Sequence, residues 1–170
     1  MQLTEGEAKL IAGYILADYR HELATTRKVL QAIPDGRETY CPDERSMNTL
    51  KLAWHVASAD KFFLDSVLAG AFAPGEGKLP ESIKRAADVI AWHDANIPAA
   101  LDAVGAMPGS ALAADVDFFG MMKTQAVNYL MLMAKHAIHH RGQLSAYLRP
   151  MGAKVPGIYG PSGDTPVPAK

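Results

Sequence analysis

Apolar residues recur every three or four positions along most of the chain, which is the spacing of one face of an α-helix. Thr4 and Glu7 form a capping-box pattern just ahead of the first such series. The turn-forming residues 34–36, Pro-Asp-Gly, follow its last member. The series predicts one long amphipathic helix, and its core face consists of Leu16, Tyr19, Leu23, Thr26, Leu30 and Ile33.

Two further series predict a second and a third helix. Ser46 is the expected N-cap of the second helix, and the glycine- and proline-rich residues 70–80 predict the loop that follows it. The apolar stripe of the second helix contains Leu52, His55, Ala59 and Phe62. We expect the third helix to start near Pro80 and to end at residues 107–110, with a kink or a break at Pro98.

The fourth predicted helix runs from Met121 to Leu148, and residues 111–120 before it are either a short extended stretch or irregular. Its stripe comprises Tyr129, Met133, His136, His140, Leu144 and Tyr147. No alternating run is long enough to predict a sheet. The chain is therefore expected to be an all-α four-helix bundle with long connections. Residues 1–155 would form the bundle, and residues 156–170 an irregular tail rich in proline and glycine.

Composition narrows the class of protein. The 170 residues suit one domain, and a hydrophobic fraction of 49% with a net charge of -1 argues against disorder. No basic excess is available for nucleic acid or an anionic membrane. The apolar stretch Tyr129–Ala134 is too short to span a bilayer, and the acidic start of the chain does not resemble a signal peptide. With Cys41 as the single cysteine, we expect a reducing, cytoplasmic compartment and no disulfide.

Histidine is the one residue type whose placement composition does not explain. The chain has six, and three of them lie within residues 136–140. His136 and His140 are four residues apart, so a helix places them on the same face about one turn apart. His55 lies on the apolar stripe of another predicted helix. Three imidazoles from two facing helices could share one divalent ion and leave a fourth position for water or substrate.

The other histidines and motifs point less clearly to chemistry. A single histidine on an apolar face is more often a hydrogen-bonded core residue than a ligand. His139 is expected beside the site or at the surface, His93 is a weak fourth candidate, and His21 is expected in solvent. The fourth helix contains no Glu, which argues against a ferritin-like di-iron site, and no His-Glu-x-x-His or phosphate-binding glycine motif occurs.

Several polar residues are candidates for neighbours of the site that the sequence does not place. They are Asp94, Asn128, Gln143 and Tyr159. Cys41 precedes a proline in a predicted loop and is expected to be a free thiol rather than a nucleophile.

Two segments of the chain show a family resemblance. They are residues 136–152, His-Ala-Ile-His-His-Arg-Gly-Gln-Leu-Ser-Ala-Tyr-Leu-Arg-Pro-Met-Gly, and residues 46–57, Ser-Met-Asn-Thr-Leu-Lys-Leu-Ala-Trp-His-Val-Ala. Both resemble the histidine-bearing helices of the DinB family, also called DinB/YfiT-like metalloenzymes. The tail segment 155–164 is similar to a C-terminal extension in part of that family. The resemblance implies a four-helix bundle that holds one divalent metal ion with His55, His136 and His140. We expect this ion to be zinc or nickel. The resemblance also implies a homodimer.

Several kinds of function stay open for such a site. The family is similar in fold to transferases and isomerases that use mycothiol, bacillithiol or glutathione, so a low-molecular-weight thiol could be activated for attack on a small-molecule substrate. A metal-dependent hydrolase that activates water is the alternative. A third possibility is a non-catalytic stress protein that binds a metal or a small molecule, or a bundle whose histidines are core residues.

Overall fold

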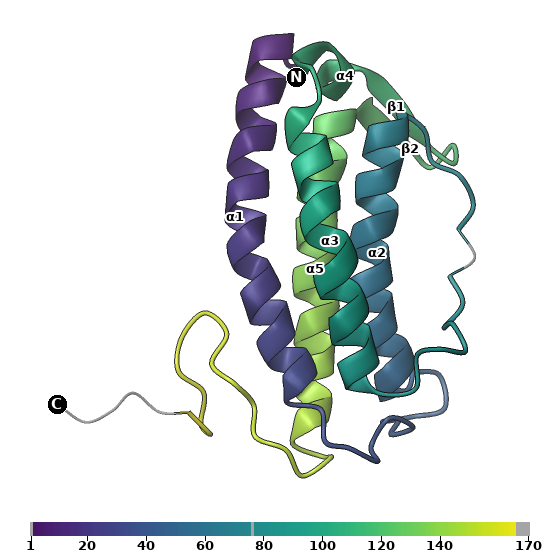
Figure 1. Ribbon diagram of the computed structural model, residues 1–170, viewed down its shortest axis with the longest axis vertical. Coiled ribbons are helices and arrows are strands. Elements are labelled where there is room, and N and C mark those ends of the chain that lie inside the picture. The colour runs from purple at the N-terminus through teal and green to yellow at the C-terminus, as the bar shows by residue number, and fades with distance from the viewer. Residues whose placement is uncertain (1, 76, 166–170) are drawn as a thin grey trace, which may run out of the picture.

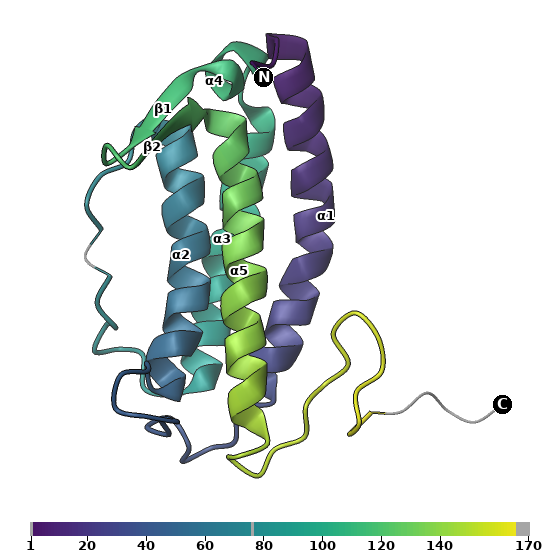
Figure 2. The ribbon, with the colours of Figure 1, turned by 180° about the vertical axis from the view of Figure 1, so that it is seen from behind.

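Four long helices form the body of the molecule in the computed structural model, which describes residues 2–75 and 77–165 (Figure 1). α3 and α5 each pack against both α1 and α2, and Figures 1 and 2 show these two helices on opposite sides of the bundle. The long helices are α1 (Glu5–Gln31), α2 (Thr49–Ala69), α3 (Ala86–Ala106) and α5 (Ala126–Leu148), and the short elements are α4 (Gly109–Ala113), β1 (Asp115–Phe118) and β2 (Met122–Gln125). The all-α bundle expected from the sequence is confirmed.

The predicted N-cap is correct for α1 and wrong for α2. Thr4 caps α1 as predicted, because its hydroxyl accepts from the amide of Glu7 and the Glu7 carboxylate accepts from the amide of Thr4 at 2.7 Å. The predicted N-cap of α2 at Ser46 is wrong. Asn48 takes that role, accepting from the amide of Lys51 at 2.9 Å, while Ser46 donates its hydroxyl to Asp43.

α3 departs from its predicted start and from its predicted break. It begins at Ala86 rather than near Pro80, because residues 80–83 form a separate turn and Asp88 accepts from the amides of Lys84 and Arg85 at the helix start. Pro98 lies inside the helix, which nevertheless runs on to Ala106. A proline removes one backbone hydrogen bond, and tertiary packing on a long helix can tolerate that loss.

A small antiparallel hairpin replaces the first turn of the predicted fourth helix. Asp115 pairs with Gln125 and Phe118 with Met122, so α5 begins at Ala126 rather than at Met121. Phe119 and Gly120 turn the chain with positive φ angles of 52° and 72°. The expectation of no sheet is therefore wrong for eight residues of the chain.

The core is apolar for most of the bundle's length, with a few buried polar side chains. Its fully buried large residues include Tyr19, Leu64, Leu101, Tyr129 and Met133. One of the buried side chains is the charged Arg141, which is 1% exposed. No helix among the described residues is both long and apolar enough to cross a membrane. Part of the predicted tail, residues 166–170, lies outside the described residues, and 156–165 contain no helix.

Candidate metal centre

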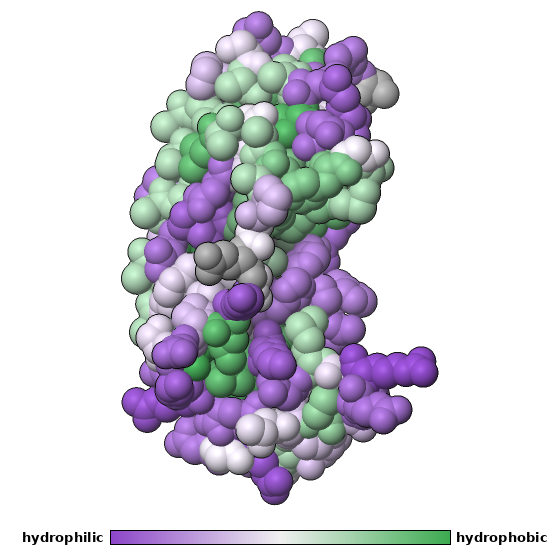
Figure 3. Space-filling model, turned by 90° about the vertical axis from the view of Figure 1, so that its right-hand side faces the viewer, coloured by the Kyte–Doolittle hydropathy of each residue, from purple (hydrophilic) through white to green (hydrophobic). Residues whose placement is uncertain are grey.

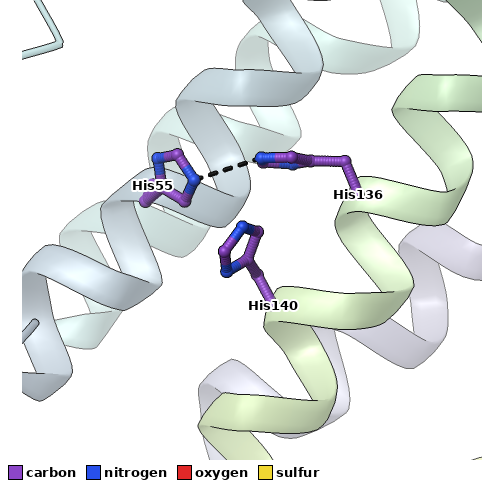
Figure 4. A group of neighbouring side chains, drawn as sticks. All are labelled: His55, His136 and His140. Carbon is purple, nitrogen blue, oxygen red and sulfur yellow. Dashed lines mark hydrogen bonds between the residues drawn. The ribbon is translucent and has the colours of Figure 1, made fainter. Parts of the chain in front are cut away.

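Three histidine side chains meet between α2 and α5 (Figure 4). His55 comes from α2, and His136 and His140 come from successive turns of α5. The Nε2 atoms of His55 and His136 lie 3.2 Å apart, and one ring nitrogen from each of the three residues lies within 4.8 Å of the others. The sequence-predicted grouping of these three residues is thus present in the structure.

The histidines lie at the edge of the core rather than in its centre. The buried stripe of α5 consists of Leu130, Met133, Ala137, Arg141, Leu144 and Leu148. His136 and His140 each directly precede a member of that stripe, and both are only partly buried. His55 is likewise partly buried, between the buried residues Trp54 and Val56. The prediction that these histidines lie on the apolar stripes is thus corrected, because the structure places them beside the stripes.

Burial keeps the three rings neutral. Partial burial and the neighbouring histidines lower the pKa of His136 from 6.5 to about 4. Burial, followed by the proximity of His140, lowers the pKa of His55, and burial also lowers the pKa of His140. A neutral imidazole has a free lone pair on one ring nitrogen, which is the form that binds a metal ion.

Gln143 and Phe63 are the nearest supports of the rings. The Nδ1 of His140 lies 2.6 Å from the side-chain oxygen of Gln143, one turn further along α5. This contact fixes Nδ1 as the protonated nitrogen and leaves Nε2 to face the other rings. The ring of Phe63 lies edge-on to His136, with centroids 5.8 Å apart. The sequence named Gln143 without placing it and gave no signal for Phe63.

The donor set fits one divalent cation. Two nitrogen ligands of a tetrahedral zinc ion lie ~3.3 Å apart, which follows from Zn–N distances of about 2.0–2.1 Å. The 3.2 Å between His55 and His136 matches that spacing, and small ring rotations would bring in the third nitrogen. The Nδ1 of His136 is buried and has no hydrogen-bond partner among the described residues. Of the two histidines of α5, only His140 has a ring that such a contact orients, and its partner is Gln143.

The remaining histidines lie elsewhere, as their sequence positions suggested for two of them. His139 and His21 are exposed, although the ring of His139 stands 4.8 Å from that of His140. His93, the weak fourth candidate, is buried between α3 and α2, where its Nε2 lies 3.6 Å from a carboxylate oxygen of Asp60. It does not join the group of three.

The other candidates for neighbours of the site are engaged away from it. Asn128 donates to Thr124 at 2.8 Å, and Asp94 pairs with Arg27. The hydroxyl of Tyr159 contacts Arg141, the residue after His140, on the α1 side of α5. None of these polar groups supports the three rings directly.

Comparisons with known proteins show the family and the fold of the chain. The family model described as the DinB family matches residues 11–166. The uncharacterized protein YrdA of Bacillus subtilis (strain 168) is 29% identical over 152 residues, which are 88% of each chain. A DinB-like protein from Bacillus cereus ATCC 10987 has a similar solved structure, with 25% identity, a TM-score of 0.71 and coverage of 85% of this chain and 95% of that one. The DinB-like protein YjoA of Bacillus subtilis shares the fold at 22% identity and a TM-score of 0.70, over 85% of this chain and 97% of that one.

Proposed function

This chain belongs to the DinB family, and we propose that it binds one divalent metal ion through His55, His136 and His140 and works as a metal-dependent enzyme on a small molecule. The observation that carries the proposal is the meeting of three ring nitrogens, within 4.8 Å of one another, from two different helices. Three neutral imidazoles supply the ligands, and zinc or nickel suits such a donor set.

The ligand count is what favours a catalytic role over a structural one. Structural zinc sites are closed by four protein ligands, whereas catalytic sites use three and leave one position open. Among the described residues, no fourth His, Cys, Asp or Glu joins the group. A divalent cation with an open position supplies Lewis acidity, which lowers the pKa of a thiol or a water molecule until it becomes a nucleophile near neutral pH.

The chain's own residues would then hold and orient rather than react. Gln143 fixes the ring of His140, and Phe63 packs against His136 and limits the access of bulk water on that side. Cys41, the single thiol of the chain, lies exposed in the α1–α2 connection with its sulfur directed at the carbonyls of Asp43 and Ser46. The nucleophile is accordingly proposed to be a low-molecular-weight thiol, as in an S-transferase or isomerase, with water as the alternative in a hydrolase.

The metal proposal is tested by measuring bound metal in purified protein and in His136→Gln. Wild-type protein should hold about one ion per chain, whereas the variant should lose most of it because one of three ligands is gone. His139→Gln is the matched control, since it changes an exposed histidine on the same helix. Circular dichroism shows whether each variant is folded. Wild-type protein that takes up no zinc, nickel or cobalt would contradict the proposal.

Thiol and water can be separated with cobalt in place of the native ion. Addition of glutathione, or of another small thiol, should change the visible cobalt spectrum if the thiol binds at the open position. A spectrum that no thiol alters would favour the hydrolase or a non-catalytic metal-binding protein instead. Sedimentation at micromolar protein tests the homodimer that the family resemblance implies.

A further inference from the structure

A cavity of about 380 Å³ adjoins the three-histidine site and shares His55 with it. Its walls come from one edge of α2, from Trp92 on α3 and from the connection between these helices. The α2 edge is formed by residues spaced three or four apart, His55, Ser58, Ala59 and Phe62. Figure 3 faces the side of the molecule on which α2 and this connection lie, and it shows apolar side chains gathered in the upper half of that face.

Both aromatic walls of the cavity are held in place. Trp92 stands edge-on to Trp54 with ring centroids 4.8 Å apart, and the indole N–H of Trp54 donates to the carbonyl of Lys78 at 3.1 Å. On the other side, Phe62 packs against Phe63 and Phe72 at 5.7 and 5.5 Å. Rings fixed in this way need no ordering when a ligand binds between them, so little conformational entropy is lost.

The wall supplied by the α2–α3 connection is thin. A Cβ built on Gly75 would lie 3.6 Å from the Phe62 ring, so the backbone itself passes along the edge of that ring. Gly75 itself places no side chain in front of Phe62. The cavity is therefore shaped by two rings and a strip of backbone, which suits a flat ligand.

The cavity carries no uncompensated charge among its described lining residues. Among the described lining residues, Lys61 alone has a side chain with a fixed charge, and its ammonium donates to both carboxylate oxygens of Asp65 at 2.6 Å. A charged ligand would leave its own charge unpaired in a largely apolar space, which is costly. The lining therefore favours a neutral ligand, with the Ser58 hydroxyl available for one hydrogen bond.

We propose that this cavity binds the apolar, planar ring of a neutral aromatic substrate and places its reacting group beside His55. The assignment of the ligand as a substrate rests on the proposed metal site, whereas binding in the cavity does not require a metal. Ser58 is the specificity-determining position, because a larger side chain there would occupy the space between the two aromatic walls.

The binding step can be tested on metal-free protein by NMR of the two tryptophan indole N–H groups, the only two in the chain. Benzyl alcohol is the aromatic probe and cyclohexylmethanol its aliphatic match. Benzyl alcohol should shift the Trp92 signal in a saturable way and bind about twofold to tenfold more tightly than the aliphatic probe, the preference expected for ring–ring contacts. Equal affinity, or no saturable shift, would overturn the inference.

Two variants fill the cavity from opposite sides. Ser58→Leu and Gly75→Leu should each weaken benzyl alcohol binding about tenfold or more, because both place side-chain atoms in the ligand's space. Ala103→Leu adds the same side chain to an exposed position on α3, away from the cavity, and should leave the affinity within about twofold. Undiminished binding in both filled variants would overturn the proposal, and the second variant retains the test if the first does not fold.

The relation to the metal site is tested separately. In cobalt-loaded protein, the ring protons of bound benzyl alcohol should relax faster than in zinc-loaded protein, and Ser58→Leu should abolish the difference while keeping its metal. Saturable binding in a protein that takes up no metal would leave the cavity assignment standing and refute the proposed function. Metal uptake without any binding of the probe would refute the cavity assignment alone.

Discussion

Arg141 offers the most demanding test of how the bundle holds the site in place. Its guanidinium is 1% exposed and lies between α5 and α1. One nitrogen donates to the carboxylate of Glu22 at 2.5 Å and also contacts the hydroxyl of Tyr159, and another donates to Thr26 at 3.2 Å. The residue directly follows His140, so the same turn of α5 is fixed to α1 by Arg141 and faces α2 with His140, a proposed metal ligand.

Replacing Arg141 by Met should destabilise the protein by about 3 kcal/mol. Removing one partner of a buried ion pair typically costs about 3–5 kcal/mol, because the remaining charge stays buried without compensation. The Glu22 side chain is 12% exposed and still accepts from Tyr159 at 2.9 Å, which places the expected loss at the lower end. Glu22→Leu should cost a similar amount, since it leaves the guanidinium unpaired.

The double variant of Arg141→Met with Glu22→Leu should recover most of the loss. Two apolar side chains of similar volume remove both charges at once, and such exchanges are often close to neutral. Urea unfolding of all four proteins in the metal-free state gives the interaction free energy, and an unchanged urea dependence shows that the same transition is compared. The reasoning is refuted if Arg141→Met costs less than about 1 kcal/mol or if the two losses simply add.

Three further predictions concern the site and the hairpin. Gln143→Leu should weaken metal binding about tenfold or more by releasing the His140 ring, and a metal affinity equal to that of wild type would contradict this role. Calorimetry of metal binding at pH 6.5, in buffers of different ionisation enthalpy, should show that fewer than one proton is released, because the pKa of His136 lies at about 4 and the pKa values of His55 and His140 are also lowered. Three histidines with ordinary pKa values would release about 1.5 protons. Tyr129→Phe should lower the free energy of unfolding by about 1–2 kcal/mol, because the buried hydroxyl lies 2.9 Å from the carbonyls of both Val116 and Met122. Hydrogen exchange in residues 115–125 should also become faster. An unchanged free energy of unfolding would contradict this role of the hydroxyl.

Acid should also weaken the metal-free protein over a defined range. The folded state keeps His136 neutral down to a pKa of about 4, whereas the unfolded chain protonates it near 6.5. Its contribution to stability is therefore present above pH 6.5 and is lost as the pH falls toward 4.

The long helices were predictable because each buries a continuous stripe over five or more turns. Apolar residues that recur every three to four positions from Leu16 to Ile33 indicate a helix and no other secondary structure. The capping box at Thr4 marks the start of that helix. The start of α2 was missed since Ser46 and Asn48 are both good N-caps two residues apart. The choice between them depends on Asp43, which binds Ser46 within the connection.

The hairpin and Arg141 were not predictable for two separate reasons: the strands of the hairpin are very short, and the partners of Arg141 are distant in the sequence. Two strands of four residues are too short for an alternating pattern, and the hairpin is tied to α5 by the hydroxyl of Tyr129. Arginine is rarely buried, and no local pattern indicates that Arg141 meets Glu22, 119 residues away. Local patterns cannot contain such contacts.

The position of the histidines at the edge of the core has a consequence for their chemistry. One residue on a helix corresponds to a rotation of about 100°, so His136 and His140 are turned away from the stripe formed by Ala137 and Arg141. Ligands in the centre of that stripe would be surrounded by packed side chains, and an ion there would have no space for a further small molecule. At the edge, the rings are buried enough to stay neutral and remain partly accessible. The same edge of α2 continues from His55 to Phe62 along the cavity, so the offset that separates His55 from the core also places it at the space that we propose for the substrate.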